Sequence, residues 1–368
     1  MHDSRKIDVK KCQICTLSNW LQLLHQLNLS KWTMYRFALL IFVFISISCS
    51  NKAEYHKFSG ETMGTYYAIT YRGKNPQKVK ADVERLLEEF NNSLSTYIPS
   101  SFISRLNESE AGLYLPMDDP FFEPVLKKAT ELQKLTNGKL NTAILPLLTY
   151  WRDNSTKIDS TKSKELQQLV ANSKFAIVES ENGKFVTKSE ARAKLDFSSL
   201  AKGYGIDVIG HYFEKLGIVN YLVDIGGEAR GFGVSSSEES WKLAINKPLE
   251  GSGFTEMELV VQLSGQSIAT SGSYRQFYEK DGKKIAHIMD PLTGYSTTSD
   301  LLSASVIAED CMIADGLATA LMISSLEEAI AFLDENDFKA CLIYDADGDA
   351  KLEKYFANGF EELVLYSK

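Results

Sequence analysis

The succession of strand-like and helix-like stretches restricts the fold of this chain more than any other feature. Residues 65–71 are β-branched and aromatic, which is typical of a strand. Residues 76–94 instead place Val79, Val83 and Leu87 on one helical face. The same reasoning predicts further helices over residues 121–135, 163–172, 201–216, 314–323 and 326–335, and further strands over residues 221–225, 241–245, 257–263, 266–270, 303–308, 340–344 and 363–366, with a hairpin over residues 176–186. Because strands and helices do not alternate regularly, as parallel βαβ units would, the sequence predicts an α+β fold.

The charge and the cysteine content exclude several classes of protein. The chain of 368 residues has a formal net charge of -8 without a local cluster of Lys and Arg, so no nucleic-acid-binding surface is expected. Its five cysteines are too few and too scattered for a disulfide framework. Cys12 and Cys15 have the spacing of half a zinc site, but no second ligand pair lies nearby. Cys311 and Cys341 lie in apolar stretches and are expected to be buried thiols.

An apolar run near the amino terminus predicts export. Arg36 precedes residues 37–47, which are apolar except for Ser46, and Cys49 follows Ser48. The run is well short of the ~20 apolar residues that span a bilayer, and it fits a signal-peptide core of ~7–15 residues. The preferred interpretation is cleavage before a lipidated Cys49, as in a bacterial lipobox, although Ser46 stands where leucine is usual. Plain secretion and an uncleaved membrane anchor are the alternatives.

This interpretation divides the chain into four parts. A signal peptide begins a chain, so Met34 is the expected initiator, and residues 1–33 are expected to be an unstructured upstream extension. Residues 34–48 would be the lipoprotein signal peptide and residues 49–60 a lipidated tether. Because no internal repeat, low-complexity tract or long linker follows, residues 61–368 are predicted to form one domain.

Two glycine-containing segments have the composition of ligand-binding turns. Residues 196–205 combine small residues with Lys202 at the expected start of a helix, where free N–H groups and a positive charge favour phosphate. A capped helix with a solvated lysine would give the same sequence. Residues 224–231 contain Gly226 and Gly227, which permit close backbone approach to a ligand but are also common in tight turns. Neither segment is a dinucleotide fingerprint or a P-loop.

Two later segments carry potential catalytic and metal-binding side chains. His287 lies just before Asp290, and a histidine with a carboxylate neighbour can act as a general base, although a structural histidine would look similar. Asp315 and Thr319 are four residues apart, so they share one face of the predicted helix. Their oxygens are of the kind that binds Mg²⁺. The alternative is a helix carboxylate beside a threonine that bonds to the helix backbone.

Taken together and in this order, the segments resemble the ApbE family of FAD:protein FMN transferases. The resemblance begins at residues 62–65 (TMGT), includes 94–97 (LSTY) and 104–107 (SRLN), and extends to Ala320. It implies a single ApbE-like α+β domain, related to the T-fold, with FAD as substrate and Mg²⁺ as cofactor. Matching motif positions imply FAD contacts at Met63, Tyr97, Lys139, Leu140, Asn141, Asp196, Lys202 and Ile288, metal ligands at Ser199, Asp315 and Thr319, and a catalytic group at His287.

Three positions depart from the family pattern. Asn141 stands where aspartate is usual and Leu140 where phenylalanine is usual, which changes the FAD contacts expected there. Ser199 replaces a residue that is commonly Gly or Ala, and its backbone oxygen would still serve as a ligand.

The resemblance also implies a reaction. FMN would move from FAD to a threonine or serine hydroxyl of another protein, with AMP as the leaving group. His287 would accept the hydroxyl proton, and Mg²⁺ would neutralise charge on the phosphates. The acceptor would be a flavin-carrying protein such as a respiratory electron-transfer subunit, and the enzyme would face the periplasm from the inner membrane. The alternatives are Mg²⁺-dependent hydrolysis of FAD to FMN and AMP, non-catalytic flavin binding, and a purely structural surface lipoprotein.

Overall fold

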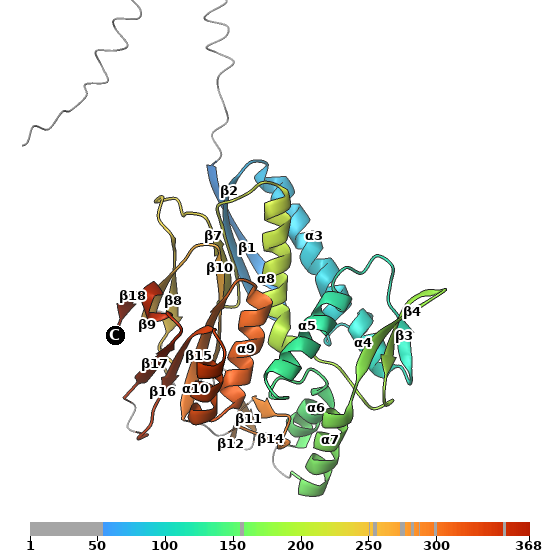
Figure 1. Cartoon of the computed structure of the whole chain (residues 1–368). Coiled ribbons are helices and arrows are strands. Elements are labelled where there is room, and N and C mark those ends of the chain that lie inside the picture. Colours follow the sequence, from blue (N-terminus) through green and yellow to red (C-terminus); the bar gives the residue numbers. More distant parts are fainter. Residues whose placement is uncertain are drawn as a thin grey trace, which may run out of the picture. The chain divides into compact units, whose positions relative to one another are not determined.

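Most of the chain from Glu54 onward is described by a computed structural model (Figure 1). The described residues are 54–154, 158–249, 251–252, 256–272, 277–280, 283–286, 288–297, 300–348 and 351–368, with the backbone alone for 277–280 and 283–286. The helices are α3 (Pro76–Leu94), α4 (Phe102–Glu108), α5 (Phe122–Leu135), α6 (Leu145–Asn154), α7 (Ser160–Asn172), α8 (Ser198–Lys215), α9 (Cys311–Ile323), α10 (Leu326–Glu335) and the short 3-10 helix η1 (Glu361–Leu363). The strands are β1 (Glu54–Thr62), β2 (Thr65–Gly73), β3 (Gly112–Tyr114), β4 (Phe175–Ser180), β5 (Gly183–Lys188), β6 (Tyr221–Ile225), β7 (Glu228–Phe232), β8 (Trp241–Asn246), β9 (Met257–Leu263), β10 (Gln266–Gly272), β11 (Phe277–Lys280), β12 (Lys283–Ala286), β13 (Met289–Asp290), β14 (Tyr295–Ser296), β15 (Leu301–Ala308), β16 (Lys339–Tyr344), β17 (Glu353–Ala357) and β18 (Val364–Ser367).

An eight-stranded antiparallel sheet forms the centre of the fold, with strand order β1-β2-β6-β7-β10-β15-β16-β17. Two three-stranded sheets, β18-β9-β8 and β3-β5-β4, accompany it, together with the short pairs β11-β12 and β13-β14. Helix α8 directly precedes β6 in the chain. Helices α9 and α10 connect the neighbouring strands β15 and β16. Helices and antiparallel strands are thus combined in one unit, and the predicted α+β fold is confirmed.

The middle strands of the large sheet are covered on both faces. Side chains alternate between the two faces of a strand. Ile268 and Ile307 pack with Leu259 of the β18-β9-β8 sheet on one face. Their neighbours Ala269 and Val306 pack on the other face with the helices, including α9. Helix α9 therefore lies directly over β10 and β15.

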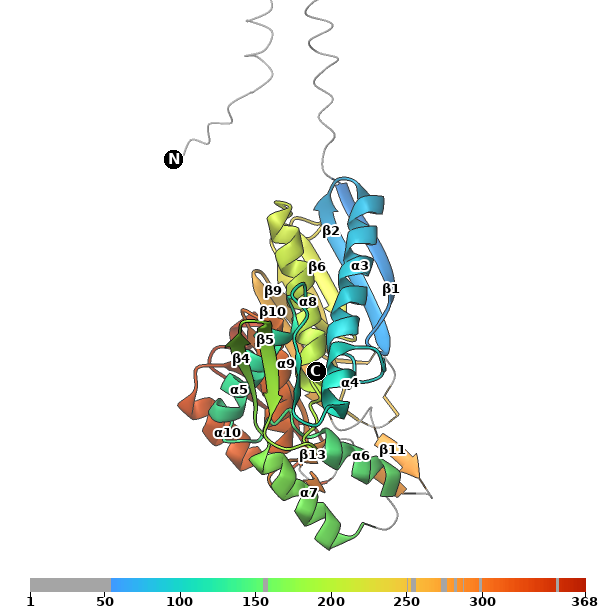
Figure 2. The same cartoon turned by 90° about the vertical axis from the view of Figure 1, so that its right-hand side faces the viewer.

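Helices α3 and α8 cover the other half of the same face, over β2 and β6 (Figure 2). Tyr67 and Tyr221 of the strands are buried against Val83 of α3 and Ile209 of α8. Each such fully buried apolar side chain contributes about 1.5–3 kcal/mol. The apolar face predicted for residues 76–94 is the buried face of α3.

Most predicted elements are confirmed, and several further ones are present. Helices α3 and α10 and strands β6 and β9 have the predicted bounds. Helices α8 and α9 each begin three residues earlier than expected, at Ser198 and Cys311. The strand β7 and the helices α4 and α6 were not expected. Strand β1 covers residues 54–60, part of the predicted tether, because its backbone pairs with β2 along its whole length.

The predictions for the amino-terminal segment lie outside the described residues; this applies to Cys12, Cys15, Met34 and Cys49. Within the described ranges, no helix combines the length and the hydropathy needed to cross a membrane. Cys311 and Cys341 are buried free thiols, as predicted.

Candidate active site

Helices α8 and α9 approach each other so closely that glycine is required at their contact. A methyl group on Gly203 would lie 2.6 Å from the carbonyl carbon of Cys311, too close for any side chain. Leu200, earlier in α8, instead meets Gly316, later in α9. The two helices therefore run antiparallel with their backbones nearly in contact, and polar side chains at this seam are held in fixed positions (Figure 1).

A lysine of α8 bridges two buried carboxylates at this seam. The Lys202 ammonium nitrogen lies 2.7 Å from Oε1 of Glu228 on β7 and 3.6 Å from Oδ1 of Asp315 on α9. The backbone N–H of Gly203 donates to Oδ2 of Asp315 at 3.1 Å. Both carboxylates are almost completely buried. We call Lys202, Glu228 and Asp315 the lysine–carboxylate cluster.

The lysine–carboxylate cluster sets two acidic side chains against one ammonium group. Burial alone would lower the pKa of Lys202, but the carboxylates of Asp315 and Glu228 outweigh it and raise that pKa, so the lysine is charged. Burial and the nearby Asp315 raise the pKa of Glu228 well above its ordinary value. Glu228 Oε2 is buried and finds no hydrogen-bond partner in the part of the chain that the structure describes. Since a buried oxygen without a partner is costly, a bound cation or hydrogen-bond donor beside Oε2 would be stabilising.

The three predicted metal ligands lie on the two helices that meet at this seam. Asp315 and Thr319 are one turn apart on α9, and Ser199 lies in the first turn of α8, next to Leu200, which meets Gly316 of α9. The hydroxyl oxygens of Thr319 and of Ser271 on β10 are 3.4 Å apart. Within the described ranges, no three His, Cys, Asp or Glu side chains gather as metal ligands. One carboxylate with hydroxyl or carbonyl oxygens nevertheless suits Mg²⁺, which keeps waters and binds substrate phosphates.

The segment that opens α8 joins several of the predicted FAD contacts. Asp196 accepts a hydrogen bond from the backbone N–H of Ser198 at 2.7 Å, at the start of the helix. Its own N–H donates to the carbonyl of Thr142 at 2.7 Å, next to Asn141. Its other carboxylate oxygen accepts from the Thr96 hydroxyl at 3.5 Å, next to Tyr97. Asp196 therefore holds together three segments that are far apart in the sequence.

The other predicted FAD contacts differ in how they are placed. Tyr97 is 84% exposed, and its ring is accessible to a planar ligand. The Lys139 ammonium forms an ion pair with Glu328 at 3.1 Å. Leu140 is a core residue that packs near Gly316. Leu140 thus packs against α9 from within the hydrophobic core.

Asn141, Met63 and Ile288 complete the set. The side chain of Asn141 accepts from the N–H of Ala143 at 2.9 Å and donates to the carbonyl of Val170 at 3.4 Å, so both of its ends are used within the protein. Met63 is half-buried at the β1–β2 turn, and its terminal methyl lies against Gly205 of α8. Ile288 is buried in the main core.

The predicted catalytic residue, His287, lies outside the described residues. The segment that follows it is anchored on α6 and α7. The carbonyl oxygen of Gly294 accepts from the Ser163 hydroxyl at 2.8 Å and from the Trp151 indole N–H at 2.9 Å. Asp290 accepts from the N–H of Leu292 at 2.8 Å and so fixes the turn between them.

Sequence reasoning missed Glu228 as a member of the site. It directly follows the pair Gly226-Gly227, which was examined only for its backbone properties. A carboxylate beside a glycine pair is equally typical of an exposed turn, so no local signal of its burial was present. The partner of Glu228, the half-buried Lys202, lies 26 residues earlier, and no local pattern joins the two.

A lysine held between buried carboxylates, near the start of a helix, has the composition of a polar ligand site. Comparison with known proteins identifies the family: a model described as the ApbE family matches residues 63–342, and this chain belongs to that family. The resemblance inferred from the sequence is confirmed.

Named relatives and solved structures agree. A Vibrio cholerae protein named FAD:protein FMN transferase is 31% identical over 324 residues, covering 86% of this chain and 95% of the relative. A Haemophilus influenzae protein of the same name is 31% identical, covering 82% of this chain and 89% of the relative. The structure of the flavin transferase ApbE from Vibrio cholerae has a TM-score of 0.72 at 30% identity, covering 84% of this chain and 99% of that one. The apo flavinyl transferase ApbE from Pseudomonas stutzeri has a TM-score of 0.73 at 26% identity, covering 86% and 99%.

Proposed function

We propose that this protein is an FAD:protein FMN transferase that depends on Mg²⁺. The observation that carries the proposal is the lysine–carboxylate cluster, which brings the ammonium of Lys202 to within 3.6 Å of the Asp315 carboxylate at the contact of α8 and α9. The names of the relatives support the same activity. The cluster favours it over a structural surface lipoprotein or a passive flavin carrier, because neither requires two carboxylates buried against one lysine.

The residues of the chain would divide the work as follows. Asp315, Thr319 and Ser199 would hold Mg²⁺, which supplies neutralisation of charge on the FAD pyrophosphate. The charged Lys202 would attract the same phosphates, and the first turn of α8 would add N–H donors. Tyr97, Met63 and Ile288 would form the walls that orient the flavin.

The chemical step would be a substitution at phosphorus. A threonine or serine hydroxyl of the acceptor protein attacks the FMN-side phosphorus, while His287 accepts the hydroxyl proton. The new phosphoester bond forms as the anhydride bond breaks, and AMP leaves with the electron pair. Most of the rate enhancement would come from positioning and charge stabilisation.

An assay with the full exported protein tests this proposal. Purified protein is incubated with FAD, Mg²⁺ and a candidate flavin-carrying respiratory subunit, and intact-mass spectrometry follows the acceptor. We expect the acceptor to gain the mass of one FMN phosphoester in step with the release of AMP, and chelation of Mg²⁺ should stop both. An acceptor protein in which the target threonine or serine is replaced by alanine serves as the control.

Two other outcomes would contradict the proposal. FAD split to FMN and AMP, with no adduct on any acceptor tested, would identify a Mg²⁺-dependent FAD pyrophosphatase. Tight flavin binding without AMP release would identify a non-catalytic flavin-binding protein.

We further propose that the protein is lipid-anchored through Cys49 in the inner membrane of a bacterial envelope, facing the periplasm, with synthesis starting at Met34. The support is the sequence alone, namely the short apolar run directly before Cys49. Expressed from Met34 in a bacterial host, the Cys49→Ser variant should move from the membrane fraction to the soluble periplasmic fraction. Continued association of this variant with membranes would point to an uncleaved helix.

A further inference from the structure

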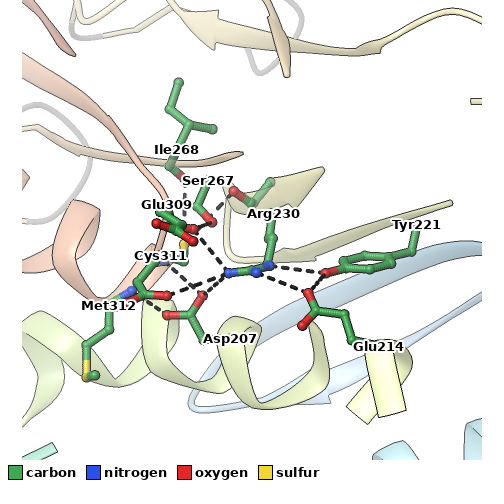
Figure 3. A network of polar contacts seen from close by, with 11 residues as sticks. Asp207, Glu214, Tyr221, Arg230, Ser267, Ile268, Glu309, Cys311 and Met312 are labelled. Carbon is green, nitrogen blue, oxygen red and sulfur yellow. Dashed lines mark hydrogen bonds and ion pairs between the residues drawn. The ribbon is translucent and has the colours of Figure 1, made fainter. Parts of the chain in front are cut away.

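A buried arginine connects β7 to the start of α9 (Figure 3). The Arg230 guanidinium donates to Oδ1 of Asp207 at 3.1 Å and to Oε1 of Glu214 at 3.1 Å, both on α8. It also donates to the hydroxyl of Tyr221 and to the backbone carbonyl of Glu309, each at 3.1 Å. The side chain of Arg230, which is almost completely buried, thus donates hydrogen bonds to four residues from three parts of the chain. We call Arg230, Asp207, Glu214 and Tyr221 the arginine network.

Asp207 of this network caps a helix other than its own. Its Oδ1 accepts from the backbone N–H of Cys311 at 2.9 Å, and its Oδ2 accepts from the N–H of Met312 at 2.8 Å. Asp310, the residue directly before α9, makes no side-chain capping bond. The first amides of α9 are therefore satisfied from α8, and this explains why α9 begins earlier than its sequence predicts.

The arginine network and the lysine–carboxylate cluster lie at two successive positions along the contact of β7, α8 and α9, which we call the first and the second level. Glu228 and Arg230 are two residues apart on β7, so both face the helices. Lys202 and Asp207 lie on successive turns of α8, and each reaches one of these two strand residues. On α9, the capped residue Cys311 lies one turn before Asp315. Any slip of α9 at the first level would therefore move Asp315 away from Lys202 at the second.

We propose that Asp207 and Arg230 are positioning residues that set the register of α9 on α8 and thereby place Asp315 for metal binding. This inference rests on the proposed function, because it assumes that Asp315 binds a divalent cation. The hydrogen bonds of the network are directional, whereas apolar side chains packed at the same place would allow the helices to slide. Glycine is also needed here, since a methyl group on Gly210 would lie 2.9 Å from the Arg230 side chain.

The experiment measures metal binding directly. Mn²⁺, which accepts the same oxygen ligands as Mg²⁺, is titrated into the exported protein with and without FAD, and electron paramagnetic resonance reports the free ion. In the Asp207→Asn variant one carboxylate oxygen is replaced by an NH₂ group. This group cannot accept a hydrogen bond from Arg230 or from the backbone N–H groups of Cys311 and Met312. We expect its Mn²⁺ affinity to fall by about 10–100-fold, the usual range for residues that orient metal ligands.

Matched variants separate positioning from general loss of stability. Leu259→Ala removes a buried side chain on the opposite face of the sheet, so it should lower the melting temperature but leave Mn²⁺ affinity unchanged. Arg230→Lys keeps the positive charge beside Asp207 but cannot reach Glu309 and Glu214 together, so it should weaken Mn²⁺ binding less than Asp207→Asn. If Asp207→Asn fails to fold, Arg230→Lys decides.

The outcomes distinguish the two proposals. If the unsubstituted protein binds no Mn²⁺ with or without FAD, the proposed metal site is wrong and the inference falls with it. If it binds Mn²⁺ and Asp315→Ala does not, the metal site stands. An affinity within about twofold of the unsubstituted protein in Asp207→Asn, or in Arg230→Lys where that variant decides, then overturns the positioning role alone.

Discussion

Replacing Asp315 with alanine is expected to reduce FMN transfer by at least about a thousandfold, which corresponds to about 4 kcal/mol of transition-state stabilisation. The carboxylate is buried, lies 3.6 Å from the Lys202 ammonium and is the one acidic side chain among the predicted metal ligands. Without it, the predicted set of metal ligands would contain only neutral oxygens, those of Ser199 and Thr319. The measurement is the initial rate of FMN adduct formation over a range of Mg²⁺ concentrations.

The same substitution should not unfold the protein. In Asp315→Ala the charges of Lys202 and Glu228 balance, whereas the unsubstituted cluster has two buried carboxylates for one ammonium. We therefore expect the melting temperature without metal to equal or exceed that of the unsubstituted protein. Mg²⁺ should no longer raise it, because a ligand stabilises only the state that binds it. Asp337→Ala, at an exposed position, is the control. Mg²⁺-dependent turnover that persists in Asp315→Ala within about threefold would remove Asp315 from the site.

The parts of the site that sequence alone predicts are those whose signal is local. Asp315 and Thr319 are four residues apart in an apolar helix, so their shared face follows from helical geometry. The small residues before Lys202 likewise indicate a helix start, although α8 begins at Ser198 rather than at residue 201. In both places the chemistry and the secondary structure are encoded within a few neighbouring residues.

The parts that sequence missed depend on partners far along the chain. Strand β7 contains Glu228 and Arg230, and two charged residues beside glycines look like a surface turn rather than a buried strand. Their burial is possible only because Lys202 and Asp207 of α8 neutralise them, and no local pattern shows this pairing. The same reasoning applies to the start of α9, whose capping group belongs to another helix.

Replacing Gly203 with alanine is expected to cost both stability and activity, although alanine is the better helix former by roughly 1 kcal/mol. The new methyl would lie 2.6 Å from the carbonyl carbon of Cys311 and 2.8 Å from the amide nitrogen of Met312. These are backbone atoms that no side-chain rotation can move, so α8 and α9 must separate. Overpacking of this kind costs about 1–3 kcal/mol, which thermal unfolding would detect.

The activity of Gly203→Ala should fall further than its stability implies. Gly203 donates to Asp315 at 3.1 Å, so separating the helices lengthens this bond and draws Asp315 away from Lys202. A displacement of about 1 Å at a reacting centre can cost about a hundredfold in rate. Gly205→Ala is the matched comparison for stability, because the one close contact of its methyl would be with the terminal methyl of Met63, at 2.6 Å, and that group can rotate away. We expect Gly205→Ala to melt near the unsubstituted protein. If Gly203→Ala were as stable and as active as the unsubstituted protein, the close contact of α8 and α9 could not be what holds Asp315 in place.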